Sequence, residues 1–93
     1  NVFPTEVENV LAEHPAVNEV AVVGLADARW GERIHAVVSL TAGQAATTEE
    51  LRDFCKGKIA AFKIPKTIDI WAEIPKGATG KIQKRNIIDF YTP

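Results

Sequence analysis

The sequence predicts an α+β fold, with a small mixed sheet of about three strands and flanking helices in the order αββαβα. Two kinds of pattern lead to this fold class. Some segments are rich in valine or alternate apolar and polar residues, which is typical of strands. Between them lie segments whose apolar residues recur at helical spacing. Glycine or proline separates most of these segments. The chain of 93 residues has room for a single small domain.

A helix is predicted over residues 6–13, near the start of the chain. Thr5 and Glu8 form a Thr-x-x-Glu pattern, which is typical of a capping box at a helix N-terminus. The residue before a proline avoids the helical region, so the helix is expected to stop at His14 and Pro15.

Two strands are predicted next, over residues 17–25 and 34–40, because both segments are rich in valine and other apolar residues. Residues 27–31 are expected to form the connecting loop. Two consecutive strands that are joined by a loop of this moderate length pair most simply in the antiparallel sense.

A second helix is predicted to open at Thr47, which forms another capping box with Glu50, and to continue to about Ala61. Gly57 lies inside this predicted helix and costs it about 1 kcal/mol relative to alanine if it is exposed. Cys55 falls on the apolar face, where a cysteine behaves as a small buried hydrophobe and not as a nucleophile.

The last third of the chain completes the predicted fold. A third strand is expected over residues 67–72, where apolar and polar side chains alternate. Residues 75–80 are expected to form a loop. A short final helix is predicted over residues 84–91, because isoleucine and tyrosine recur there at helical spacing.

The composition excludes several classes of protein. Cys55 is the single cysteine, so an internal disulfide is impossible, and a reducing, cytoplasmic location is expected. No apolar run is long enough to span a membrane, and no signal-peptide pattern is present. The chain starts at Asn1 and contains no methionine, so we expect it to be a piece of a longer polypeptide.

The charges are distributed unevenly along the chain. Residues 1–55 contain three Lys or Arg and nine Asp or Glu, whereas residues 56–85 contain eight and two. A basic surface attracts polyanions, although a solvated lysine-rich face would give the same pattern. Aromatic residues do not alternate with the basic ones, as they do in proteins that bind single-stranded nucleic acid. The pattern therefore favours a nucleotide or CoA and predicts no nucleic-acid partner.

The most informative segment runs from Pro75 to Arg85 and reads PKGATGKIQKR. Gly77 and Gly80 are expected to take positive φ and to let the backbone approach a ligand. Lys81 would then bring one ammonium group to a phosphate or a carboxylate. The segment is not a Walker A loop, because proline and isoleucine stand where that motif needs glycine and a hydroxyl residue.

Five segments of the chain are informative in combination. They are Asn1-Val2-Phe3-Pro4-Thr5-Glu6-Val7-Glu8, His14-Pro15-Ala16-Val17, Asp27-Ala28-Arg29-Trp30-Gly31-Glu32, Phe62-Lys63-Ile64-Pro65, and the loop that ends in Gly80-Lys81. In this order and at these separations, they resemble the small C-terminal domain of the acyl-adenylate-forming enzymes. That superfamily includes acyl-CoA synthetases, adenylation domains of peptide synthetases, and luciferases.

The resemblance implies that residues 1–93 are the mobile C-terminal domain of an ATP-dependent acyl-CoA synthetase. The large N-terminal domain and the hinge residue would lie upstream of Asn1. Such an enzyme converts a carboxylic acid and ATP into acyl-adenylate and pyrophosphate, and then transfers the acyl group to CoA. The acid, ATP and CoA would be substrates of the full enzyme. Mg²⁺ would bind in the large domain, and this domain alone would bind no cofactor.

The resemblance also assigns a catalytic residue. Lys81, which follows Gly80, would enter the active site of the large domain in the first step. There it would contact the carboxylate substrate and the phosphate under attack.

Two further pairs of residues would form the CoA-binding surface. Trp30 and Gly31 would border the channel for the pantetheine arm, and Phe62 and Lys63 would lie near the CoA nucleotide. Some CoA-using relatives carry an arginine two positions after the phenylalanine, but this chain has Ile64 there.

Other interpretations stay open at this point. An adenylation domain of a peptide synthetase would share the lysine but would pass its product to a carrier protein. In a small regulatory or ligand-binding α+β module, the loop of Lys81 would be incidental. Trp30 would then pack on the sheet, and Phe62 would be a core residue at a helix end.

His14 and His35 are expected to be structural, and no metal site is predicted, because neither histidine has a second ligand at metal-binding spacing.

Overall fold

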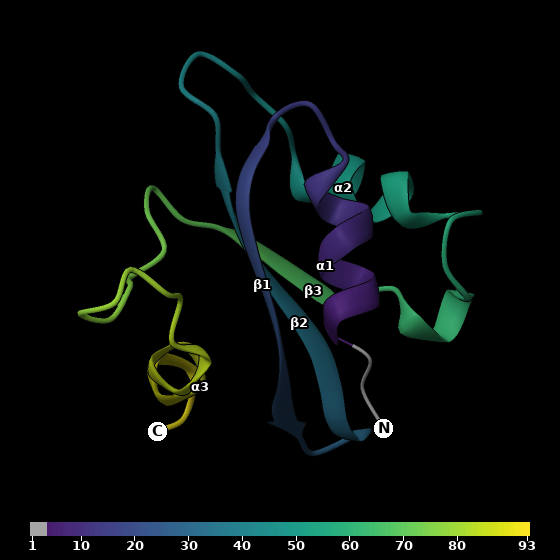
Figure 1. Cartoon of the computed structure of the whole chain (residues 1–93). Coiled ribbons are helices and arrows are strands. Elements are labelled where there is room, and N and C mark those ends of the chain that lie inside the picture. The colour runs from purple at the N-terminus through teal and green to yellow at the C-terminus, as the bar shows by residue number, and fades with distance from the viewer. Residues whose placement is uncertain (1–3) are drawn as a thin grey trace.

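The computed structural model describes residues 4–93 and has the predicted element order (Figure 1). Strands β1 and β2 pair in the antiparallel sense, and β2 pairs in parallel with β3, so the sheet is mixed and has the order β1-β2-β3. The elements are α1 (Pro4–Ala12), β1 (Val17–Asp27), β2 (Gly31–Leu40), α2 (Thr48–Cys55), the 3₁₀ helix η1 (Ala61–Lys63), β3 (Thr67–Ile70) and α3 (Lys84–Tyr91).

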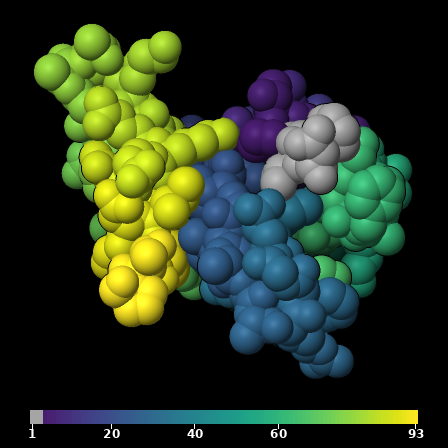
Figure 2. Space-filling view, turned by 90° about the horizontal axis from the view of Figure 1, so that it is seen from below, coloured from purple at the N-terminus to yellow at the C-terminus, as the bar shows by residue number. Residues whose placement is uncertain are grey.

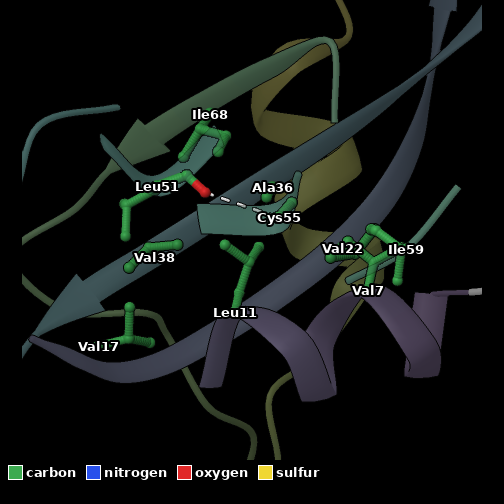
Figure 3. Packing of buried hydrophobic residues seen from close by; sticks show 10 residues of the cluster. All are labelled: Val7, Leu11, Val17, Val22, Ala36, Val38, Leu51, Cys55, Ile59 and Ile68. Carbon is green, nitrogen blue, oxygen red and sulfur yellow. Dashed lines mark hydrogen bonds between the residues drawn. The ribbon is translucent and has the colours of Figure 1, made fainter. Parts of the chain in front are cut away.

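Helices cover both faces of the sheet. Helices α1 and α2 lie on one face and α3 lies on the other (Figure 1). The first face forms a cluster of buried residues, drawn in Figure 3: Val7, Leu11, Val17, Val22, Ala36, Val38, Leu51, Cys55, Ile59 and Ile68. A second cluster lies under α3: Ala21, Val23, Leu25, Val37, Ile74 and Ile87. Because both faces are covered, β1 and β2 have continuous buried runs in place of a simple alternation.

The start of α1 differs from the prediction. The helix begins at Pro4, a residue that suits the first helical position because its missing N–H has no partner there anyway. Thr5 therefore lies inside the helix, and the expected capping box with Glu8 is wrong. The carboxylate of Glu8 instead accepts a hydrogen bond from the backbone N–H of Val22, at 2.8 Å. Residues 1–3, which belong to the first of the five segments, lie outside the described residues.

The connection between β1 and β2 is tighter than the predicted loop. Asp27 and Gly31 pair with each other at the strand ends, which leaves a turn of residues 28–30. One carboxylate oxygen of Asp27 accepts hydrogen bonds from the backbone N–H groups of Arg29 and Trp30, at 2.8 and 2.9 Å. These bonds, that of Trp30 first, lower the pKa of Asp27 below its usual value. Gly31 has φ of +80°, which a side chain would disfavour.

Helix α2 opens as predicted but ends early. The Thr47 hydroxyl accepts a hydrogen bond from the Glu50 N–H, and the Glu50 carboxylate accepts one from the Thr47 N–H, so the capping box is confirmed. The helix ends at Cys55 and does not reach Ala61, because Gly57 takes φ of +79°, a left-handed conformation that breaks a helix. Cys55 is buried as expected, and its thiol donates to the carbonyl oxygen of Leu51 (Figure 3).

The last elements agree closely with the sequence analysis. Strand β3 begins at Thr67 as predicted but ends at Ile70, two residues before the expected end at Ala72. Helix α3 has the predicted bounds, Lys84–Tyr91. None of the helices in residues 4–93 has the length and apolar character that a bilayer-spanning helix requires.

Candidate functional site

Lys81 follows a tight turn that projects from the body of the domain. The Gly80 N–H donates to the carbonyl oxygen of Gly77 at 3.0 Å, and the Gly77 N–H donates to the carbonyl oxygen of Lys81 at 2.8 Å. A β-bridge between Lys76 and Ile82 closes the base of this turn. Figure 2 shows the segment as an arm that extends away from the rest of the molecule.

The two glycines of the turn differ in conformation and in surroundings. Gly80 has φ of +82°, as predicted, and open space lies where a Cβ atom would point. Gly77 does not take positive φ, so this part of the prediction is wrong. A Cβ atom at Gly77 would collide with the amide group of the Gln83 side chain. A larger residue at position 77 would therefore require the exposed side chain of Gln83 to move.

The side chain of Lys81 is exposed and unpaired. Within residues 4–93, it is the single Lys or Arg whose side chain makes no hydrogen bond, ion pair or ring contact. The others contact Asp27 (Arg33), Pro65 (Arg52), Asp53 (Lys56), Phe54 (Lys58), Glu6 (Lys63), Glu19 (Lys76), Glu8 (Lys84), Asp89 (Arg85) and Trp30 (Arg29 and Lys66). Lys81 is thus free to engage an anion on another body.

Trp30 lies at the tip of the β1–β2 hairpin. Its side chain is 57% exposed, so it does not pack on the sheet as the structural alternative required. The ammonium group of Lys66 lies 4.7 Å from the Trp30 ring centroid, and the guanidinium carbon of Arg29 lies 5.3 Å from it. Both distances are typical of cation–π contacts. With Gly31, the hairpin tip presents an aromatic ring flanked by two positive charges.

Phe62 lies on η1 and is 71% exposed, which contradicts the alternative that it is a core residue. The ammonium group of Lys63 lies 5.8 Å from the Phe62 ring centroid and 2.8 Å from a carboxylate oxygen of Glu6. An exposed aromatic side chain with an adjacent cation suits a planar anionic ligand such as a nucleotide.

The predicted site residues do not converge on one point. The turn of Lys81 lies on the α3 side of the sheet, whereas η1 with Phe62 and Lys63 lies on the side of α1 and α2 (Figure 1). Trp30 and Gly31 lie at the hairpin end. The structure therefore presents two separate surfaces, one with an unpaired lysine and one with aromatic rings and cations.

The domain has a pocket of 130 Å³, lined by Leu25, Ala26, Arg33, Tyr91, Thr92 and Pro93. Pockets that enclose a small-molecule ligand usually measure about 300–1,000 Å³. This pocket is thus too small to enclose ATP.

In residues 4–93, there is no group of three or more His, Cys, Asp or Glu side chains that could hold a metal ion.

Both histidines make contacts within the domain. His14 accepts a hydrogen bond from the Ala16 N–H through Nδ1, at 3.0 Å. His35 is buried, and its Nδ1 lies 2.6 Å from the Thr67 hydroxyl. Its Nε2 lies 3.6 Å from a carboxylate oxygen of Asp69, but burial lowers the pKa of His35 more than Asp69 raises it. His35 is therefore neutral near pH 7, and the contact with Asp69 is not a full ion pair.

A family model and a curated relative place the chain in the same group of proteins. A family model described as the AMP-binding enzyme C-terminal domain matches residues 6–81. The chain is 49% identical to the human medium-chain acyl-CoA ligase ACSF2, mitochondrial, over 84 residues, which cover 90% of this chain and 14% of that protein.

Solved structures resemble the chain over nearly its full length. A fatty acyl CoA synthetase of Mycobacterium tuberculosis matches with a TM-score of 0.89 and 36% identity, over 98% of this chain and 18% of that one. The amide bond synthetase McbA of Marinactinospora thermotolerans matches with a TM-score of 0.91 and 32% identity, over 100% and 19%. The chain spans about 14% of the length of the curated relatives that it matches.

Proposed function

This chain belongs to the AMP-binding enzyme C-terminal domain family, and on that basis we propose that it acts as the mobile C-terminal domain of an ATP-dependent acyl-CoA synthetase. The observation that carries the proposal is the exposed, unpaired side chain of Lys81 on a projecting turn. A cation without a partner in its own domain suits an active site on another. That site, with the binding sites for ATP, Mg²⁺ and the acid, would lie in the large N-terminal domain.

Lys81 acts in the first step. A carboxylate oxygen of the acid attacks the α-phosphorus of ATP, so two anions must approach each other and negative charge builds on the phosphoryl oxygens. An ammonium group that is already in place stabilises this charge, and it does so most strongly where water is excluded. The turn of residues 77–80 projects from the domain, so it would carry the lysine toward a site on another domain.

The second step, the transfer of the acyl group to CoA, uses the surface with aromatic rings and cations. After adenylation, the domain rotates about a hinge outside this chain, withdraws Lys81, and presents Trp30, Gly31, Phe62 and Lys63 to CoA. The separation of the two groups of residues supports two orientations, because the turn of Lys81 and η1 lie on opposite sides of the sheet. Rigid-body rotation of a domain between two functional orientations is a known kind of switch.

CoA is the acceptor that we favour. The proposal rests on the exposed Trp30 and Phe62 with their adjacent cations and on the identity of 49% with a protein named an acyl-CoA ligase. A carrier protein, as in peptide synthetases, or an amine, as the name of McbA implies for that enzyme, is the alternative acceptor.

A cytoplasmic location stays a prediction, since the human relative is named as mitochondrial.

The decisive experiment separates the two steps in the full-length enzyme. The variant Lys81→Ala should lose adenylation by about 10²–10³-fold, the usual cost of removing one positioned charge donor. When supplied with pre-made acyl-adenylate and CoA, the same variant should form thioester at a nearly normal rate. Lys56→Ala, which removes another exposed lysine, is the matched control and should leave both steps unchanged. Comparable defects of the Lys81 variant in both steps would overturn the proposed role.

A further inference from the structure

Two ion pairs hold the base of the turn that carries Lys81. On the outgoing side, the ammonium group of Lys76 lies 2.6 Å from a carboxylate oxygen of Glu19 in β1. On the return side, the ammonium group of Lys84 lies 2.8 Å from a carboxylate oxygen of Glu8 in α1. The two pairs thus flank Lys81 in the sequence and tie its segment to two different elements of the domain.

Both carboxylates are themselves fixed by the sheet. The oxygen of Glu8 that contacts Lys84 also accepts a hydrogen bond from the backbone N–H of Val22, at 2.8 Å. Val22 belongs to β1, which is an edge strand of the sheet. The other carboxylate oxygen of Glu19 lies 3.4 Å from the hydroxyl group of Ser39, a buried residue of β2. The side chains of Glu8 and Glu19 are 21% and 23% exposed, so water screens these pairs less than it screens an ordinary surface pair.

Apolar contacts also hold the outgoing and return sides of the turn. Ile74, just before the turn, is fully buried in the cluster under α3, and Ile82, just after it, packs against that cluster. Between these anchors, the chain leaves the domain at Lys76 and returns at Ile82, where the two residues form a β-bridge. Only residues 77–81 lie beyond the anchored base.

We propose that Glu8 and Glu19 are positioning residues for Lys81, an inference that rests on the function proposed above. They fix both ends of the turn, so that each rotation of the domain brings the ammonium group to the same point in the active site. They also neutralise the two neighbouring lysines, which leaves Lys81 as the unpaired cation of the turn. Neither carboxylate contacts Lys81 itself, so both act through the backbone that carries it.

The test uses amide variants that remove the charge and keep the shape. In the full-length enzyme, Glu8→Gln and Glu19→Gln should each lower the maximal adenylation rate by about tenfold, and the double variant by about 10²-fold, because a misplacement of about 1 Å can cost that much. The KM for ATP and the rate of thioester formation from pre-made acyl-adenylate should stay unchanged. The backbone amide of Gly77 should exchange faster with solvent in these variants. The control is Asp53→Asn, which removes an exposed ion pair with Lys56 (2.9 Å) far from the turn.

A charge swap provides the second arm. The double variant Glu19→Lys with Lys76→Glu should regain most of the adenylation rate that Glu19→Lys alone loses. The inference is overturned if the amide variants behave like Asp53→Asn in adenylation and in Gly77 exchange, or if both half-reactions fall together. Failure of the proposed function looks different, because Lys81→Ala itself would then leave adenylation intact.

Discussion

The hydroxyl group of Tyr91 donates a hydrogen bond to the carboxylate of Asp69, and this contact ties the end of α3 to β3. The Tyr91 ring also lies edge-on to the buried ring of His35 in β2, with 4.5 Å between the centroids. Burial, together with the hydrogen bond to Asp69, raises the pKa of Tyr91 to about 12. Because α3 begins at Lys84, the contact anchors the far end of the helix that follows the turn of Lys81.

Removal of this hydroxyl group should weaken the domain and change its response to alkali. We expect Tyr91→Phe to lower the free energy of unfolding at pH 7 by about 1–3 kcal/mol, since a partly buried hydrogen bond to a charged acceptor is lost. The folded protein holds the Tyr91 proton more tightly than the unfolded chain does. This contribution is therefore complete below pH 10 and is lost as the pH rises from 10 to about 12.

The measurement is urea unfolding of the purified domain at pH 7, 10 and 11.5, for the wild type and for Tyr91→Phe. The difference between the two proteins should shrink above pH 10. A constant difference at all three values would show that the Tyr91 proton does not contribute to stability.

The 93-residue chain on its own should fold and stay monomeric but should not catalyse either step. Both faces of its sheet are covered, and the pocket lined by Leu25, Arg33 and Tyr91 measures 130 Å³, which is too small to enclose ATP. Circular dichroism and size-exclusion chromatography test the first two points. Release of pyrophosphate from ATP and a fatty or aromatic acid by the purified chain would contradict the third.

The turn of residues 77–81 should exchange its amide hydrogens faster than β1 and β2 do. The Gly80 amide bonds only within the exposed turn, whereas the amides of the two strands belong to a long antiparallel ladder. Hydrogen exchange followed by NMR would measure this. Equal protection of the turn and the ladder would mean that the turn is held by more than its base.

In the full-length enzyme, Trp30→Ala should slow thioester formation more than adenylation. We expect a loss of about tenfold in the second step, which corresponds to a contact of about 1.4 kcal/mol with the ligand. Phe90→Ala, which removes another exposed aromatic side chain, serves as the control. If Trp30→Ala slowed both steps equally, the residue would have only a structural role.

Local patterns in the sequence predicted most elements of the fold, and they were least accurate where one pattern fits two structures. Ile59 is apolar and stands four residues after Cys55, a helical spacing, so the predicted helix extended to Ala61. In the structure the helix ends at Cys55, Gly57 takes positive φ, and Ile59 reaches the core from a non-helical segment. Periodicity records which side chains are buried, and two backbone conformations can bury the same ones.

Contacts between distant residues explain what else the sequence did not predict. Glu8 and Thr5 have the spacing of a capping box, but Glu8 pairs with Lys84 at the other end of the chain. Lys81 was singled out because its glycine-rich loop and four other segments together resemble the C-terminal domain of the acyl-adenylate-forming enzymes. Glu8 and Glu19 were not singled out, because their partners become neighbours only after the sheet and α3 have assembled.

The buried thiol of Cys55 has a practical consequence. Maleimides react with exposed thiolates, whereas this thiol is fully buried and burial raises its pKa. A cysteine introduced at Thr79, an exposed residue of the turn, would therefore react first and would be the one labelled site in this domain. A fluorophore attached there would report, in real time, whether the turn of Lys81 is enclosed or in water at each stage of the catalytic cycle.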